Sequence, residues 1–309
     1  MTNLAYVFPG QGSQAVGMLA DVESVSKETF GEASSVLGYD LWNLIANGPE
    51  GQLNQTEYTQ PALLTCSIAL YRLALAKGLP VPDVVAGHSL GEYSALVAAE
   101  VLQFSDAVSL VQQRGRFMQS AVPIGQGGMA AIMGLSDEEV REACAEAAGD
   151  EIVQAANYNA PGQVVIAGST AAVERGIDVC KAAGAKRAMS LPVSAPFHSA
   201  LMQPAADQMA SKLESVDFSV PVLPVIQNVD AAVHNDPAAI KQNLIDQICG
   251  AVLWTGTVKT LSGMGVTTII ECGPGKVLAG LTKRIDRSVN CHNLISLESV
   301  NEASEELGS

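Results

Sequence analysis

The sequence predicts an α/β protein in which a parallel sheet forms a large domain and a smaller domain is inserted into it. Three observations predict this arrangement. Short apolar segments of strand length alternate with segments of helical periodicity, as in parallel α/β sheets. One such strand leads through a Gly-x-Ser-x-Gly turn into a helix. The central part of the chain has the order β-α-β-β-α-β, which is the ferredoxin-like pattern.

The elements of the large domain follow from apolar runs and glycine turns. The first predicted strand, residues 4–8, is followed by a glycine turn at residues 9–14. Prolines lead into a second buried strand at 83–87, and the periodicity of the next stretch predicts a helix over 90–99. A later strand is expected at 267–271, before another glycine-rich turn.

The small domain begins after a glycine-rich stretch, residues 125–128, which we interpret as a hinge. Its predicted elements are strand 129–134, helix 136–148, strand 152–156, a turn at 159–162, strand 163–167, helix 170–183 and strand 187–191. We therefore predict a small domain over 126–196 and a discontinuous large domain over 1–125 and 197–309. The acidic tail, residues 298–309, is expected to fray.

Composition excludes several classes of protein. With 48% hydrophobic and 16% charged residues, the chain is too apolar to be disordered. Its 17 basic and 32 acidic residues give a net charge of −15, which argues against a nucleic-acid binder. The sequence has no apolar stretch of membrane length and no signal peptide, so we expect a cytoplasmic protein. Its six cysteines lie far apart, and no Cys/His spacing fits a metal.

The segment Gly87-His88-Ser89-Leu90-Gly91 carries the strongest chemical signal. Between a buried strand and a helix, this motif forms a nucleophile elbow, whose glycines let the chain turn tightly and expose the serine hydroxyl. The N–H of Leu90 would then lie at the helix N-terminus, where it can stabilise an oxyanion. The alternative is an ordinary strand-to-helix turn.

A serine nucleophile needs a base, and the chain has four histidines. His198 lies in an apolar loop just after the small domain and is the best candidate. His88 should point away from Ser89. His234 lies in a segment with the composition of a surface loop, and His292 lies near the C-terminus. No acid between Ser89 and His198 has the strand-end context of a triad member, so a dyad with a carbonyl-oriented imidazole fits better.

Arg114 follows a predicted helix at 105–113. Its planar guanidinium suits bidentate recognition of a carboxylate. The alternative is that Arg114 and Arg116 are solvated cations at a helix end.

Two glycine-rich motifs resemble cofactor-binding loops, but neither has the full pattern. Residues 10–15 lack the acidic strand end that a dinucleotide site requires, and residues 273–276 lack the Ser or Thr of a phosphate-binding loop.

Five motifs carry a resemblance to a known family: Phe-Pro-Gly-Gln-Gly-Ser-Gln at 8–14, Gly-His-Ser-Leu-Gly-Glu-Tyr at 87–93, Gln-Arg-Gly at 113–115, Pro-Phe-His at 196–198 and Glu-Cys-Gly-Pro-Gly-Lys at 271–276. Together they closely resemble the malonyl-CoA:acyl carrier protein transacylases of bacterial fatty acid synthesis, from about residue 3 to residue 285. The resemblance implies an α/β-hydrolase-like large domain with a ferredoxin-like insertion. It also implies a ping-pong transferase that binds no cofactor and uses malonyl-CoA and the phosphopantetheine thiol of acyl carrier protein.

The resemblance assigns a role to each matched residue. Ser89 would be the acylated nucleophile, His198 its base, and Arg114 the ligand of the malonyl carboxylate. The backbone N–H groups of Gln11 and Leu90 would form the oxyanion hole.

The resemblance also assigns roles to two further residues. The backbone carbonyl of Gln247 would orient His198, although this chain has Gly250-Ala251 where the family has an Asn-Pro pair. Phe197 resembles the malonyl-selecting form of its motif.

An acidic enzyme that meets an acidic carrier protein needs a local basic patch. Two clusters are candidates: Lys276, Lys283, Arg284 and Arg287, or Lys181, Lys186 and Arg187. Three alternatives remain: a trans-acting polyketide acyltransferase, a serine hydrolase or thioesterase of related fold, and a carrier-binding protein without catalysis. We expect a monomer.

Overall fold

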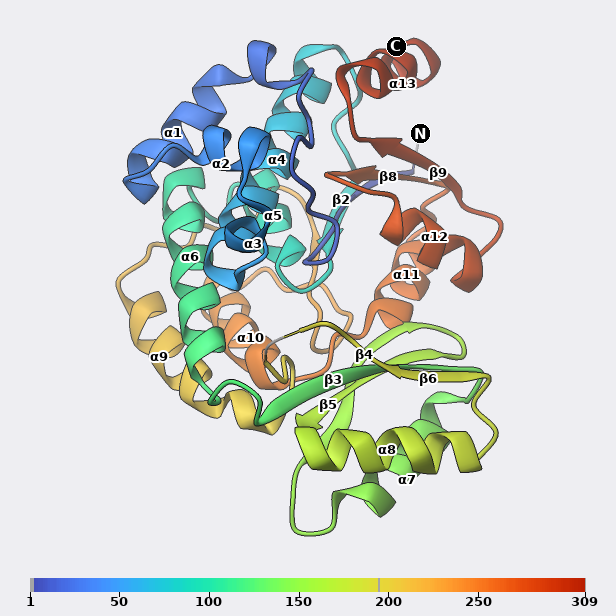
Figure 1. The fold of residues 1–309 in the computed structure, drawn as a ribbon. Coiled ribbons are helices and arrows are strands. Elements are labelled where there is room, and N and C mark those ends of the chain that lie inside the picture. The colour runs from blue at the N-terminus through green and yellow to red at the C-terminus, as the bar shows by residue number, and fades with distance from the viewer. Residues whose placement is uncertain (1–2, 194, 309) are drawn as a thin grey trace.

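The computed structural model describes residues 3–193 and 195–308, and it contains two separate sheets (Figure 1). The larger sheet has five strands in the order β7-β2-β1-β8-β9, and every neighbouring pair is parallel. Its strands are β1 (Leu4–Phe8), β2 (Val84–Gly87), β7 (Val225–Ile226), β8 (Thr268–Cys272) and β9 (Asn290–Leu294). The predicted parallel α/β sheet is confirmed.

Alternate side chains of β1 enter two different cores, because successive residues of a strand point to opposite faces. Leu4, Tyr6 and Phe8 belong to the larger core, and Ala5 and Val7 to the smaller one. The larger core is covered by α1 (Lys27–Leu37), α2 (Leu41–Asn47), α3 (Glu50–Leu53), α4 (Thr56–Ala76), α5 (Gly91–Ala98), α6 (Phe104–Ser120), α9 (Gln203–Glu214), α10 (Pro237–Cys249) and α13 (Leu297–Leu307). The smaller core is covered by α11 (Trp254–Gly263) and α12 (Val277–Ile285), on the other side of the sheet in Figure 1. Short 3-10 turns lie at Glu23–Val25 and Ala200–Met202.

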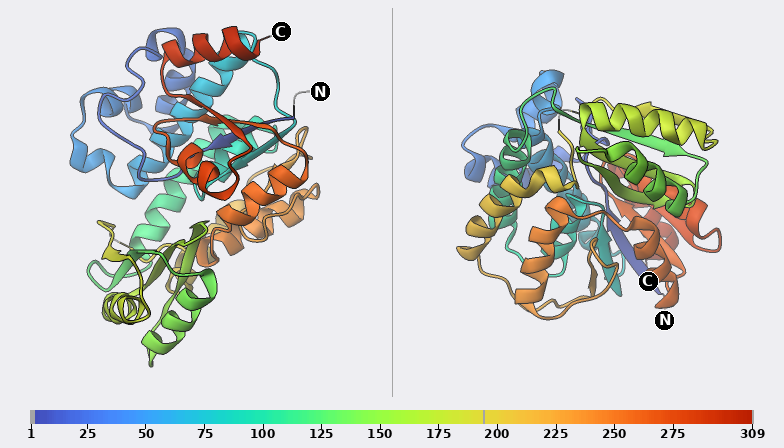
Figure 2. Two further views of the ribbon diagram at one scale, coloured as in Figure 1. Left: turned by 90° about the vertical axis from the view of Figure 1, so that its right-hand side faces the viewer. Right: turned by 90° about the horizontal axis from the view of Figure 1, so that it is seen from below.

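The second sheet is antiparallel, in the order β4-β5-β3-β6. The elements follow one another as β3 (Gly127–Met133), α7 (Asp137–Ala148), β4 (Val153–Ala160), β5 (Gln163–Ser169), α8 (Thr170–Ala182) and β6 (Arg187–Ser190). Both helices pack on one core of their own, and the unit projects from the end of the larger one (Figure 2). This is the expected ferredoxin-like order, while the boundaries at residues 126 and 196 remain predictions.

The two units are joined by backbone hydrogen bonds as well as by the chain crossings. Val252, just after α10, donates its N–H to the carbonyl of Ala156 at 2.9 Å and accepts from the N–H of Tyr158 at 2.9 Å. Strand β4 of the small unit therefore pairs side by side, through a short parallel bridge, with the segment that follows α10.

Three local predictions are wrong. The predicted hinge is partly strand, because Gly127 and Gly128 pair with Ser169 and Gly168 in β3–β5. A side chain at Gly127 would overlap Pro196, so close packing explains this glycine. Strand β4 runs to Ala160, which shortens the predicted turn at 159–162.

The acidic tail is helical instead of frayed up to Leu307, and Ser309 lies outside the described residues. Helix α13 begins at a capping box of Ser296 and Ser299 and buries Val300 and Ala303. A short apolar stripe and a good cap were therefore enough to order it. Among the helices of the described residues, none combines the length and apolarity that a membrane crossing requires.

Candidate active site

Ser89 lies at the turn between β2 and α5, as the elbow motif predicts. Its backbone has φ +52, a left-handed conformation that a serine adopts only when the surroundings impose it. Both flanking glycines are required by space. A side chain at Gly87 would overlap the backbone of Gly91, and one at Gly91 would overlap the carbonyl of Phe8 on β1.

His198 contacts the nucleophile directly. Its Nε2 lies 2.7 Å from Ser89 Oγ, and its Nδ1 lies 2.7 Å from the backbone carbonyl of Gln247. A carbonyl only accepts, so Nδ1 carries the proton and Nε2 is free to accept the serine O–H. His198 is thus held in the tautomer that a general base requires, and the interaction predicted for Gln247 is present.

The imidazole of His198 is buried, with 3% of its surface exposed. Burial, helped by the positive charge of Arg114, lowers the pKa of His198 to about 3. The ring is therefore neutral at neutral pH and can take a proton from Ser89.

Arg114 lies inside α6, which extends to Ser120, and it is only 1% exposed. The alternative of two solvated helix-end cations is wrong for Arg114. Arg116, two residues further along α6, is exposed and forms an ion pair with Glu57 at 2.7 Å. Gly115 brings the helices together, since a side chain there would lie 2.6 Å from the carbonyl of Thr56 on α4.

The hydrogen bonds of the Arg114 guanidinium all go to neutral oxygens. Nη1 donates to Gln60 Oε1 at 2.9 Å, and Nη2 donates to Gln247 Oε1 at 2.9 Å and to Ser89 Oγ at 3.2 Å. Within the described residues, Arg114 Nε has no acceptor and no carboxylate forms an ion pair with the group. A buried cation without an ion-pair partner beside a nucleophile is a ready site for a substrate carboxylate.

The turn that carries Gln11 lies against the elbow. A side chain at Gly10 would lie 2.6 Å from the carbonyl of His88, and one at Gly273 would lie 2.6 Å from Pro9 Cγ. In the described part of the chain, neither the N–H of Gln11 nor that of Leu90 donates to a protein acceptor. Their role as oxyanion donors stays a prediction.

A cavity of about 1360 Å³ opens onto the dyad. Ser89, His198 and Phe197 line it, together with the turn around Gln11 and a wall from the small unit. That wall consists of Met129, Asn157, Leu191, Pro192 and Val193. Arg114 is not among the lining residues, but its Nη2 lies 3.2 Å from the oxygen of Ser89, which is one of them.

The acyl transferase domain model matches residues 5–294 of this chain. The chain belongs to this family. A malonyl CoA-acyl carrier protein transacylase from Salmonella typhimurium is 56% identical over 288 residues, which cover 92% of this chain and 93% of the relative. Its counterpart in Bacillus subtilis is 46% identical over 291 residues, covering 93% and 92%. The resemblance found in the motifs is confirmed.

Solved structures of the family agree with the fold. The transacylase of the same name from Coxiella burnetii superposes with a TM-score of 0.98 at 47% identity, covering 100% of this chain and 98% of that one. A malonyl-transacylase solved in complex with a type II PKS acyl-carrier protein gives a TM-score of 0.97 at 51% identity, covering 99% and 100%. The family fold therefore extends over both units.

Several residues of the family site escaped the sequence prediction. Gln60, Asn228 and the side chain of Gln247 are fully buried around Arg114 and Ser89. His88 is also more than a neighbour of the nucleophile, since its Nε2 lies 2.9 Å from Asn159 Oδ1 on β4. Glu92 belongs to the motif at 87–93, but the sequence analysis gave it no role. Its position in the first helical turn after Ser89 was the one signal that could have indicated one.

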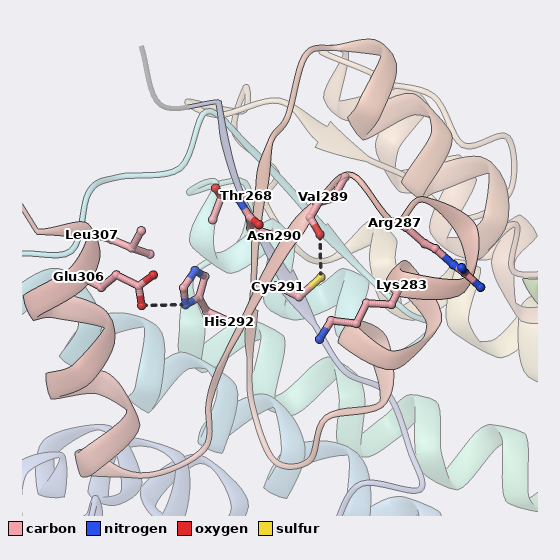
Figure 3. A pocket seen from close by; sticks show the side chains of 9 residues that line it. All are labelled: Thr268, Lys283, Arg287, Val289, Asn290, Cys291, His292, Glu306 and Leu307. Carbon is pink, nitrogen blue, oxygen red and sulfur yellow. Dashed lines mark hydrogen bonds and ion pairs between the residues drawn. The ribbon is translucent and has the colours of Figure 1, made fainter.

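A second hollow of about 650 Å³ lies at β9 and α13 (Figure 3). It is lined by Lys283, Arg287 and His292, and His292 Nδ1 lies 3.7 Å from Glu306 Oε2. None of its lining residues lines the catalytic cavity. His292 is thus separate from the dyad, in agreement with its rejection as the base.

The last histidine and a metal site remain to be placed. His234 pairs with Asp230 at 2.6 Å in a surface loop. Among the described residues, no group of three His, Cys, Asp or Glu side chains is arranged to hold a metal ion.

Proposed function

We propose that this protein transfers a malonyl group from malonyl-CoA to the phosphopantetheine thiol of an acyl carrier protein, in fatty acid biosynthesis. One observation carries the proposal. The nucleophile Ser89 Oγ lies 2.7 Å from the neutral imidazole of His198 and 3.2 Å from the buried guanidinium of Arg114, which has no ion-pair partner among the described residues. The imidazole activates Ser89 to form an acyl-enzyme, and the guanidinium selects an acyl group that ends in a carboxylate.

In the first half-reaction, Ser89 Oγ attacks the thioester carbon of malonyl-CoA while His198 Nε2 takes its proton. The developing oxyanion is held by the N–H groups of Gln11 and Leu90, and loss of one such donor typically costs about 2.7–4 kcal/mol. The C–S bond then breaks, and the imidazolium returns its proton to the departing CoA thiolate. The product is a malonyl ester of Ser89.

In the second half-reaction, the carrier thiol gives its proton to His198 and attacks the ester. The same oxyanion hole is used, and His198 finally reprotonates Ser89. Throughout, Arg114 pairs with the malonyl carboxylate, for which its planar fork is suited. We propose that this fixed carboxylate, together with the missing triad acid, favours transfer over hydrolysis. The reaction uses no bound cofactor.

Phe197 lines the cavity directly beside His198. Its bulk limits space next to the nucleophile, which supports its proposed role in selecting malonyl over branched acyl groups. The expected monomer stays a prediction.

The carrier is proposed to dock near the start of α12. The turn before this helix packs on the Gln11 turn, since a side chain at Gly275 would lie 3.2 Å from Ser13 Cβ. Lys276 follows this turn and is exposed. Lys283 and Arg287 of the same cluster line the separate hollow at β9, so Lys276 and Arg284 are the better candidates.

One observation favours a second carrier for the same chemistry. The relative solved with a type II PKS acyl-carrier protein is as similar to this chain as those named after CoA and acyl carrier protein alone. A polyketide carrier is therefore the alternative acceptor.

The proposed function is tested by following transfer of the malonyl group all the way from malonyl-CoA to the carrier protein. Malonyl-CoA and a phosphopantetheinylated fatty-acid carrier protein are mixed with catalytic amounts of the enzyme, and the carrier is weighed by mass spectrometry. Malonyl-carrier should form with the parent chain and not with Ser89→Ala. Release of free malonate without malonyl-carrier would instead establish a hydrolase. A polyketide carrier run in parallel identifies the preferred acceptor.

A further inference from the structure

Glu92 is a fully buried carboxylate directly beneath the nucleophile elbow, and the mechanism above gives it no role. It is 0% exposed and lies in the first turn of α5. Three groups donate to it: Gln227 Nε2 at 3.0 Å, the backbone N–H of Asn228 at 2.8 Å and Gln247 Nε2 at 2.9 Å. A buried carboxylate is costly unless hydrogen-bonded, and each of these donors is itself buried.

The first arm from Glu92 holds the elbow. The side chain of Asn228 accepts from the N–H of Ser89 at 2.6 Å and donates to the carbonyl of Gly87 at 2.7 Å. One amide therefore bridges the two sides of the turn in which Ser89 has φ +52. Because Glu92 fixes the backbone of Asn228, it fixes the position of this bridge.

The second arm reaches the other two groups of the site. Gln247 Nε2 donates to Glu92 and also to the carbonyl of Ser89 at 3.1 Å, while its Oε1 accepts from Arg114. The backbone carbonyl of the same residue accepts from His198 Nδ1. Movement of Gln247 would thus displace Arg114 and His198 together.

We propose that Glu92 is a positioning residue that holds Ser89, His198 and Arg114 in their mutual geometry through Asn228 and Gln247, and that it does so as an ionised carboxylate. The proposal rests on the function proposed above. All three partners of Glu92 are N–H donors, so a neutral carboxylic acid would turn an O–H toward one of them. Displacements on the order of 1 Å at a reacting centre cost about a hundredfold in rate.

The ionisation of Glu92 gives this role a signature in pH. Burial raises the pKa of Glu92 to about 7, although its hydrogen bonds and the charge of Arg114 oppose the rise. The ionisable groups that face it are Arg114 from α6 and Tyr93 from its own helix. His198 keeps its own pKa near 3, so a step near pH 7 does not come from the base.

The test compares Glu92→Gln with the matched variant Glu271→Gln. Glu271 is equally buried, but it accepts from the N–H groups of Leu278 and Ala279 at the start of α12. Two reactions of Ser89 are timed by intact-protein mass across the pH range: loading by malonyl-CoA, and labelling by a fluorophosphonate. In the second, Ser89 Oγ bonds to phosphorus, fluoride leaves, and His198 takes the proton.

Glu92→Gln should slow both reactions about tenfold or more at about pH 8 and abolish the step near pH 7. Glu271→Gln should keep the parent rates of both reactions and the step near pH 7, once the rates are corrected for the fraction of folded protein. Rates within about twofold of the parent, or a step that persists in Glu92→Gln, would overturn the proposal. If Glu92→Gln does not fold, Glu92→Asp carries the test, because it should keep the step while lowering the rate.

The two reagents separate this inference from the proposed function. A parent chain that reacts with the fluorophosphonate but not with malonyl-CoA would contradict the function alone. The effect of Glu92 on fluorophosphonate labelling would still decide the positioning role.

Discussion

The Nδ1 of His198 donates to the backbone carbonyl of Gln247, and this neutral oxygen stands where a serine hydrolase places a carboxylate. A carboxylate would stabilise the imidazolium, whereas a carbonyl fixes only the tautomer and orientation. The nearest charge is instead positive, on Arg114, and it further lowers the pKa of His198. The base of this site is therefore weak and permanently neutral at physiological pH.

The first prediction concerns the protonation of His198. Its ring should stay neutral down to about pH 5, far below the usual transition near 6.5, because burial disfavours the imidazolium. In Arg114→Ala the pKa should move upward, since a positive neighbour has been removed. An NMR titration of labelled imidazoles checks both. A parent value near 6.5 that does not respond to Arg114→Ala would contradict the account.

The same shift predicts a dependence of stability on pH. The unfolded chain binds a proton at His198 as the pH falls through about 6.5, whereas the native chain does so only near 3. The contribution of His198 to the free energy of unfolding should therefore be lost progressively between these values. Because burial also lowers the pKa of His88, part of the loss should remain in His198→Gln, and urea unfolding at several pH values should show a steeper loss in the parent. Equal slopes in the two proteins would refute this contribution of His198.

Arg114 should determine the preference for malonyl over acetyl. Arg114→Ala should lower kcat/KM for malonyl-CoA about a hundredfold, since a buried charge-assisted pair is lost, while acetyl-CoA is little affected. Arg116→Ala is the comparison, because Arg116 lines the cavity but is paired with Glu57. If Arg116→Ala lost the preference for malonyl-CoA and Arg114→Ala kept it, Arg116 and not Arg114 would bind the malonyl carboxylate.

The elbow should tolerate no side chain at Gly91. Gly91→Ala would overlap the carbonyl of Phe8 and should destabilise the fold by about 2 kcal/mol or more, measured by urea unfolding. Gly280→Ala, in α12 with open space around it, is the matched control and should stabilise by about 0.5–1 kcal/mol. Equal effects of the two substitutions would disprove the close approach of α5 to β1.

Carrier docking predicts a selective effect of charge reversal. Lys276→Glu should raise KM for the carrier protein about threefold to tenfold and leave malonyl-CoA loading unchanged, because rim charges act on encounter. Lys181→Glu, in the other basic cluster, is the matched reversal. If Lys181→Glu raises this KM and Lys276→Glu does not, the carrier docks on α8 and β6 instead.

The sequence predicted the parts of the site whose chemistry is local. The elbow is visible around Ser89 because its glycines are fixed by steric contact within a few residues and with β1. The contacts of His198 and Arg114 agree with the roles implied by the motifs. The predicted helix at 105–113 was too short, because α6 extends to Ser120. The polar residues Gln60 and Asn228 were missed because each lies in an ordinary helix or loop, and only tertiary packing buries them around the same guanidinium and elbow.

The central claim is that Ser89 carries a malonyl group held by Arg114. The most direct measurement is intact-protein mass after brief mixing with malonyl-CoA or acetyl-CoA, for the parent chain and for Ser89→Ala. We predict one malonyl adduct in the parent, absent from Ser89→Ala and favoured over the acetyl adduct. An adduct that persists in Ser89→Ala, or an equal preference for acetyl-CoA, would contradict the account.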